Sequence, residues 1–165
     1  MILEGKTIDL RPLETRDAEA LLSFCKEPGI ARYNPFWADG ETVEDYAKLI
    51  ESTRDAYAIV RKGQDTPIGV VGFEINVDLN ETALYFFLSD ACKGMGYTKE
   101  AVTMLSDWCL KETDNKYLIL VVPASHSSEG RMAEKCGFML YEKRVTIGHT
   151  LAGLSEDTYY YYRKF

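Results

Sequence analysis

Residues 84–101 read LYFFLSDACKGMGYTKEA: an apolar run, then a turn that contains glycine, then an amphipathic segment. This order predicts a strand, a loop and a helix. The first turn of a helix leaves backbone N–H groups unpaired, and the helix dipole favours an anion there. Gly94 and Gly96 lack the Cβ atoms that would hold a phosphate off the backbone, and Lys93 and Lys99 add positive charge. The stretch therefore predicts a phosphate-binding loop, or else a glycine turn that only caps a helix.

Two other phosphate-binding motifs do not fit the chain. The Walker pattern G-x-x-x-x-G-K-[ST] occurs nowhere. The dinucleotide fingerprint G-x-G-x-x-G finds Gly94 and Gly96, but Lys99 stands where the third glycine belongs. Asp114 lies about twenty residues further on, as a ribose ligand would, yet it precedes the next predicted strand instead of ending it. A nucleotide-binding protein of either class is excluded.

The rest of the chain alternates between helical and strand patterns, without a repeat, a linker or a low-complexity tract, so residues 1–165 are expected to form one domain. Expected strands cover about 8–12, 57–60, 68–77, 82–88, 117–122, 139–147 and 158–163, and expected helices about 15–25, 42–50, 98–110 and 127–135. Glu27-Pro28-Gly29 should end the first helix, and Asn34–Trp37 should form an aromatic loop. The order βααβββαβαββ predicts an α+β fold with a strand–loop–helix crossover at its centre.

Charge, hydropathy and cysteine content argue against several functional classes. A net charge of −7 argues against a protein that follows a nucleic-acid backbone. The start of the chain lacks the pattern of a signal peptide, and no apolar run approaches the roughly 18 residues that span a membrane. The four cysteines show no C-x-x-C pair and no histidine at metal spacing, so we expect reduced thiols, no metal and a cytoplasmic location.

Three segments carry a family resemblance. Residues 93–101, KGMGYTKEA, resemble the R-G-K-G-Y-A-T-E-A run of the GNAT superfamily of N-acetyltransferases, and the branch they most resemble is the ribosomal-protein alanine acetyltransferase-like (RimJ/RimL-like) one. Glu134–Phe138, EKCGF, is similar to that branch's E-K-x-G-F. Leu10–Leu13, LRPL, with Asp17 resembles its L-R-P-L…D start. The resemblance implies a GNAT-like, mostly antiparallel sheet and an acetyl-CoA-dependent enzyme.

Carried over residue by residue, the resemblance assigns cofactor-binding roles to Phe87, Leu88, Ser89, Lys93, Gly94, Met95, Gly96, Tyr97, Thr98, Lys99 and His126. In the family, the strand before the loop is splayed from its neighbour and pairs with the pantetheine arm. The backbone of Ser89 and its two predecessors would then hold the arm and polarise the thioester carbonyl. His126 stands at the family's asparagine position and could supply a similar donor; alternatively, Ser125 or Ser127 caps a helix and His126 is exposed.

Catalysis and acceptor binding rest on fewer residues. Ala133 occupies the position where some relatives place a tyrosine acid, so the acid lies elsewhere or is absent. Glu74 is the best carboxylate for a base if it faces the open side of the sheet and is partly buried, but it could equally be a solvent-facing residue. Tyr85 and the tyrosines at 159–162 are alternative acids, and water could also carry protons.

The acceptor of this family binds between the first two helices and the C-terminal strands. Two predictions are therefore open for Phe36 and Trp37: they line an apolar groove for the acceptor, or they fill the core. The loop 148–151 is expected to border the same region. The predicted function is transfer of an acetyl group to a primary amine, either a protein N-terminus or a small amine, by a monomer or homodimer. The alternative is a CoA-binding or interaction module with little or no turnover.

Overall fold

The computed structural model describes residues 2–78, 80–146 and 156–164. Its strands are β1 (Leu3–Glu4), β2 (Ile8–Pro12), β3 (Ala56–Arg61), β4 (Pro67–Asn76), β5 (Glu81–Leu88), β6 (Tyr117–Pro123), β7 (Met139–Thr146) and β8 (Glu156–Lys164). Its helices are the 3₁₀ turns η1 (Thr15–Asp17) and η2 (Asp90–Cys92), and α1 (Ala18–Phe24), α2 (Pro28–Tyr33), α3 (Pro35–Ala38), α4 (Val43–Ser52), α5 (Tyr97–Glu112) and α6 (Ser127–Lys135).

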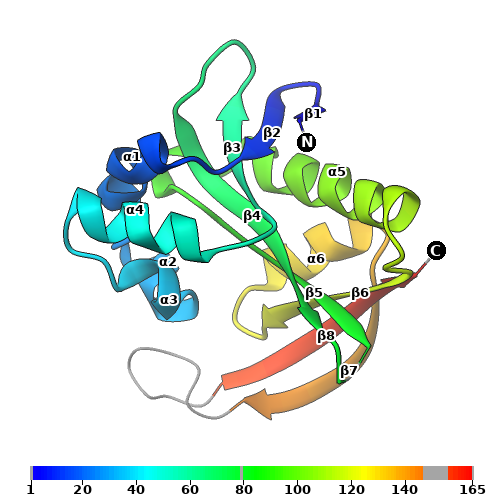
Figure 1. The fold of residues 1–165 in the computed structure, drawn as a ribbon. Helices are drawn as coiled ribbons and strands as arrows, with labels where there is room; N and C mark the ends of the chain where they lie inside the picture. The colour runs from blue at the N-terminus through cyan, green and yellow to red at the C-terminus, as the bar shows by residue number, and fades with distance from the viewer. Residues whose placement is uncertain (1, 79, 147–155, 165) are drawn as a thin grey trace.

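The strands of the described residues form one twisted sheet in the order β1-β2-β3-β4-β5-β6-β8-β7. Neighbouring strands run antiparallel except β5 and β6, which are parallel. Helix α5 makes the crossover between these two strands, as a parallel pair requires. Helices α5 and α6 cover one face of the sheet and α1–α4 the other (Figure 1). The predicted α+β fold with a central strand–loop–helix crossover is confirmed.

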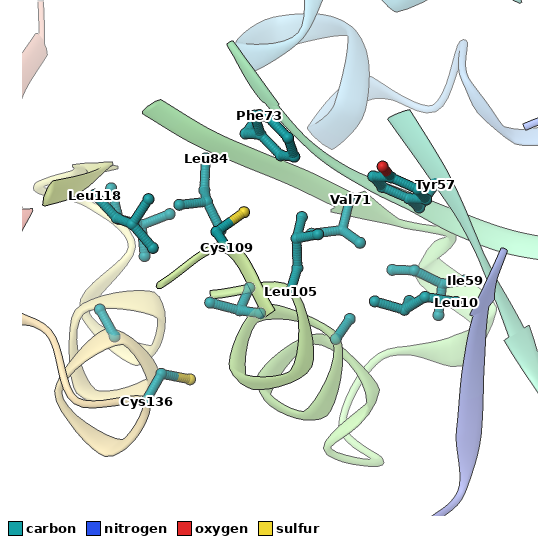
Figure 2. Close-up of a cluster of buried hydrophobic side chains, with 14 of the residues drawn as sticks. Leu10, Tyr57, Ile59, Val71, Phe73, Leu84, Leu105, Cys109, Leu118 and Cys136 are labelled. Atoms are coloured by element: carbon teal, nitrogen blue, oxygen red, sulfur yellow. The ribbon is translucent and has the colours of Figure 1, made fainter. Parts of the chain in front are cut away.

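Two hydrophobic clusters hold these layers together. Figure 2 shows the one under α5, where Leu105 and Cys109 lie against Val71 and Leu84 of the sheet. Their spacing of four residues puts both side chains on one stripe of the helix. The second cluster lies under α1–α4 and includes Trp37. The glycine loop itself is exposed, but the first cluster includes Cys92 before it and Ala101 after it, so both ends of the loop are anchored in the core.

Residues 28–38 form two short helices, whereas the prediction was a helix end at Glu27-Pro28-Gly29 and an aromatic loop at Asn34–Trp37. Proline at position 28 begins α2 and Pro35 begins α3, each in the first turn of its helix. Proline is favoured there because its missing N–H would have no helical partner anyway. The first helix does end before residue 27, as predicted, but two short helices follow it at once.

The L-R-P-L…D start of the chain forms a buried ion pair. The Arg11 guanidinium donates to both carboxylate oxygens of Asp17, at 2.8 and 2.7 Å, and the two residues are only 7% and 3% exposed. Arg11 also donates to Asp65 in the β3–β4 turn at 2.9 Å. This motif therefore joins β2, η1 and a distant turn, and its role is structural.

The second predicted helix begins with a capping box formed by Thr42 and Asp45. The Thr42 hydroxyl accepts from the Asp45 N–H at 3.1 Å, and the Asp45 carboxylate accepts from the Thr42 N–H at 3.1 Å. Among the described helices, we find none that is both long enough and apolar enough to cross a membrane.

Candidate functional site

Strands β5 and β6 diverge and leave a slot between them. They pair only from Thr82 to Leu84, opposite Leu118 to Leu120. Beyond that point β5 stays paired with β4 as far as Leu88, and β6 stays paired with β8 as far as Pro123. The facing backbone edges of the two strands therefore lack a strand partner toward the loop. An extended ligand could complete the ladder there.

The glycine loop closes the wide end of this slot. Gly94 and Gly96 have φ angles of +83° and +81°, and Gly96 is the N-cap residue of α5. A Cβ atom added at either glycine would have no heavy atom within 4 Å, so the left-handed backbone, and not crowding within the protein, requires glycine here. The first intrahelical bond runs from the Glu100 N–H to the Gly96 carbonyl at 3.1 Å. The N–H groups of Tyr97, Thr98 and Lys99 precede that bond and have no partner within the helix.

The start of α5 is tied to the β1–β2 turn. The Glu100 carboxylate accepts hydrogen bonds from the Thr7 N–H at 2.9 Å and also from the Lys6 N–H and the Thr7 hydroxyl. Burial raises the pKa of Glu100, but the hydrogen bonds from Thr7 and Lys6 lower it more, so the net shift is downward. This glutamate thus fixes the position of the helix end that presents the free N–H groups.

A cavity of about 360 Å³ lies at this helix end. Its lining residues come from the end of β5, the loop, α5 and α6: Leu88, Lys93, Gly94, Gly96, Tyr97, Thr98, Lys99, Ser128, Arg131, Met132 and Lys135. The structure thus brings together six of the residues predicted from the loop, together with Leu88. The four α6 residues were missed, although their spacing of three, four and seven is the sequence signal of one helix face.

Lys93 is not a free cation. Its ammonium group lies 2.7 Å from the Asp90 carboxylate, which lowers the pKa of Asp90. The Asp90 N–H in turn donates to the Glu27 carboxylate at 3.1 Å. The sequence argument counted Lys93 as charge available to an anion, but here a neighbouring carboxylate already offsets it.

The predicted role of the Ser89 backbone needs correction. The Ser89 N–H donates to the Ile68 carbonyl of β4 at 2.8 Å, so it is not available to a thioester. In an antiparallel ladder every second residue directs its N–H toward the partner strand. Because Ser89 faces β4, the N–H groups of Leu88 and Phe86 face the slot. Ser89 directly follows the last pair of the β4–β5 ladder, Gly69–Leu88, and extends its hydrogen bonding by one residue. The N–H of Phe87, two residues earlier, also faces β4, so the predicted backbone role of Phe87 needs the same correction.

His126 is neither exposed nor a helix-capping side chain. It is the N-cap residue of α6, but its ring makes no capping hydrogen bond. Its Nδ1 atom lies 3.2 Å from the Glu129 carboxylate, and its ring packs edge-on against Tyr33 with centroids 4.5 Å apart. The Tyr33 hydroxyl lies 3.4 Å from the Ser125 hydroxyl. These contacts link α2 to the β6–α6 junction. The contact with Glu129 uses Nδ1, so the other ring nitrogen of His126, Nε2, does not take part in it.

The two aromatic residues predicted to bind the acceptor pack edge-on, with ring centroids 5.8 Å apart, but they differ in burial. Trp37 is 4% exposed and packs against Tyr85 and Phe87, with ring centroids 6.3 and 5.4 Å away. Its carbonyl accepts from the Tyr46 hydroxyl at 2.8 Å. Phe36 is 55% exposed. Trp37 therefore fills the core, which was one of the two predicted alternatives. Phe36 is exposed, so its ring is the one that an acceptor could contact.

The candidate base and acids lie on the α1–α4 side of the sheet or in the core. Glu74 is exposed, so it lacks the partial burial that the sequence argument required of a base. It pairs across the sheet with Ala83, and its charge contributes, after burial, to raising the pKa of Tyr85 well above its usual value. Ala133 is fully buried in the core under α5. The loop 148–151 lies outside the described residues.

All four cysteines are buried and unpaired as disulfides, as expected for thiols packed as small apolar groups. The Cys92 sulfur accepts a hydrogen bond from the Arg61 guanidinium at 2.9 Å. Within the described part of the chain, no group of three His, Cys, Asp or Glu side chains is arranged to hold a metal ion.

Comparison with known proteins agrees with this geometry. The chain is 29% identical over 150 residues to the probable N-acetyltransferase YjcK of Bacillus subtilis (strain 168), and the match covers 83% of each chain. Its fold is similar to RimL, the ribosomal L7/L12 alpha-N-protein acetyltransferase, solved in complex with coenzyme A, with a TM-score of 0.86, 16% identity and coverage of 100% of this chain and 98% of that one. It is also similar to the ribosomal-protein-S5-alanine acetyltransferase of Vibrio fischeri, with a TM-score of 0.84, 15% identity and coverage of 99% and 96%.

The diverging strands, the glycine loop and the crossover helix define the fold of an acetyltransferase. The family model described as an acetyltransferase (GNAT) domain matches residues 7–139. The chain belongs to the GNAT family of acetyltransferases, as its sequence motifs predicted.

Proposed function

We propose that this protein is an N-acetyltransferase that takes its acetyl group from acetyl-CoA and passes it to a primary amine. The observation that carries the proposal is that the β5–β6 slot and the cavity at the start of α5 share the end of β5, where Leu88 lines the cavity. The slot suits an extended pantetheine arm, and the cavity offers backbone N–H groups and cations to a diphosphate. The donor set therefore fits acetyl-CoA, which supplies an activated thioester.

The residues of the chain would act mainly by binding and orienting. The N–H groups of Tyr97, Thr98 and Lys99 would hold the diphosphate with the help of the α5 dipole. On β5, the N–H groups of Phe86 and Leu88 would hold the arm and polarise the thioester carbonyl. In this proposal they replace the Ser89 N–H, which is already engaged. Met95 remains a proposed backbone contact and His126 a proposed contact to the arm.

The acceptor would approach from the α1–α4 side. The amine nitrogen attacks the carbonyl carbon, the carbon–sulfur bond breaks, the amine gives up a proton and the thiolate gains one. Phe36 would offer an apolar surface to the acceptor. Glu74 is close enough to Tyr85 for its charge to raise the pKa of that tyrosine, and although it is exposed we retain it as the proposed proton acceptor, assisted by water.

Calorimetry with acetyl-CoA, followed by a thiol-release assay, tests the proposal. The assay would compare peptides with free N-termini, the same peptides with acetylated N-termini, and small primary amines. We expect tight binding and thiol release that requires a free amine. Binding without release on any amine would contradict the enzyme assignment, and absence of binding would contradict the cofactor assignment.

One observation favours a second function, a CoA-binding module with little or no turnover. The position of the tyrosine acid in some relatives is Ala133 here, which is fully buried among apolar side chains and has no polar atom to give a proton. Such a module would bind CoA and acetyl-CoA equally and release no thiol in the same assay.

A further inference from the structure

One face of α6 forms a wall of the cavity at the start of α5. The residues on this wall are Ser128, Arg131, Met132 and Lys135. Arg131 and Lys135 are exposed and lie one turn apart. Lys99, in the first turn of α5, lines the same cavity. Three cationic side chains thus border one space.

Among the described residues, these cations have no acidic partner. In residues 2–78, 80–146 and 156–164, no carboxylate forms an ion pair with Arg131, Lys135 or Lys99, whereas Lys93 on the same cavity is paired with Asp90. Like charges at positions i and i+4 of a helix repel each other. A chain with a net charge of −7 has acidic residues to spare, so an unpaired basic cluster here indicates a bound anion.

The diphosphate alone does not account for the α6 wall. The N–H groups of α5 and the adjacent Lys99 come from a different helix that lines the same cavity, and they already form an anion site. A second phosphate group on the same ligand would use the remaining cations. Met132, between Arg131 and Lys135 on the same face, offers an apolar surface for the sugar that links the two phosphate groups.

We propose that Arg131 and Lys135 bind the 3′-phosphate of CoA and make the site selective for CoA over 3′-dephospho-CoA. This inference rests on the proposed function, because it assumes that CoA is the ligand of the cavity. It assigns cofactor selectivity to a helix that is separate in sequence from the glycine loop.

Calorimetric titration with CoA and with 3′-dephospho-CoA tests the inference on the full chain. The variants are the double substitution R131A/K135A and a control, K48A/K111A, which removes two exposed lysines from α4 and from the far end of α5 and gives the same net charge. We expect wild type to bind CoA about tenfold more tightly than 3′-dephospho-CoA, since charge-assisted hydrogen bonds to phosphate are strong but partly screened by salt.

In R131A/K135A this ratio should fall to about twofold or less, with an unchanged Kd for 3′-dephospho-CoA, whereas K48A/K111A should keep the wild-type ratio. Thermal melts would check that all variants fold. Equal affinity of wild type for the two ligands overturns the inference and leaves the proposed function standing. An equal loss of both affinities in R131A/K135A overturns it too, because the cations would then bind the diphosphate. If wild type binds neither ligand, the proposed function itself fails.

Discussion

Two glycines with the same backbone conformation allow binding to be separated from folding. Gly96 has a φ angle of +81° and Gly63, in the β3–β4 turn, has +79°. A Cβ atom added at either one meets no heavy atom within 4 Å. Substitution by alanine should therefore cost each protein the same left-handed strain and nothing else, about 1–2 kcal/mol of the free energy of unfolding. For a chain of this length that corresponds to a drop in Tm of roughly 2–8 °C.

The two variants should differ in cofactor affinity. G96A places a methyl group among the N–H groups at the start of α5 and strains the turn that aims them, whereas G63A is remote from the cavity. Loss of one charge-assisted hydrogen bond to a phosphate costs about 1.5–3 kcal/mol, so the Kd for acetyl-CoA should rise about 10- to 100-fold in G96A. In G63A the Kd should stay at the wild-type value.

Differential scanning calorimetry and isothermal titration of the two variants measure both quantities. Equal losses of stability with a selective loss of binding are the expected result. A G96A protein that is destabilised like G63A but binds acetyl-CoA normally would refute the role given to the loop. A G96A protein with unchanged stability would refute the strain argument.

Three further outcomes follow from the packing. A Cβ atom at Gly130 would lie 2.6 Å from the Tyr161 hydroxyl oxygen, so G130A should lose about 1–3 kcal/mol in denaturant unfolding, and adding Y161F should restore part of it. Arg11→Met leaves a buried carboxylate without its partner and should cost about 3–5 kcal/mol in the same measurement; a loss below 1 kcal/mol would count against a structural ion pair. Burial raises the pKa of the Cys25 and Cys109 thiols to about 12, above the ordinary value near 9, so these thiols should resist a thiol reagent at pH 8 in the native state and react after unfolding. Because only the unfolded chain ionises them between those values, stability should fall as pH rises above about 9, and a flat profile would contradict the buried placement.

Much of the fold follows from local pattern. The change from helical to alternating periodicity identifies the strands that flank the glycine loop, and the capping box at Thr42 sets the start of α4. The short helices α2 and α3 were not predicted, because proline is compatible both with the end of one helix and with the first residue of the next. Local sequence cannot decide between these, since packing under α4 makes the choice.

Site residues could be predicted where one continuous segment supplies them. They were harder to predict where their role depends on neighbours that are distant in the sequence. The loop glycines and the start of α5 follow from residues 93–101 alone. The ion pair of Lys93, the engaged N–H of Ser89 and the burial of Trp37 depend on which residue lies next to each in space. Arg131 and Lys135 carry a helical spacing in the sequence, but only the tertiary fold places that face on the cavity.

Amide chemical shifts report most directly whether the start of α5 holds the diphosphate through its backbone. A ¹⁵N-labelled sample titrated with acetyl-CoA should show its largest downfield amide shifts at Tyr97, Thr98 and Lys99, while the Gly63 amide in the β3–β4 turn stays unmoved. Saturable binding with these three amides unperturbed would contradict the account.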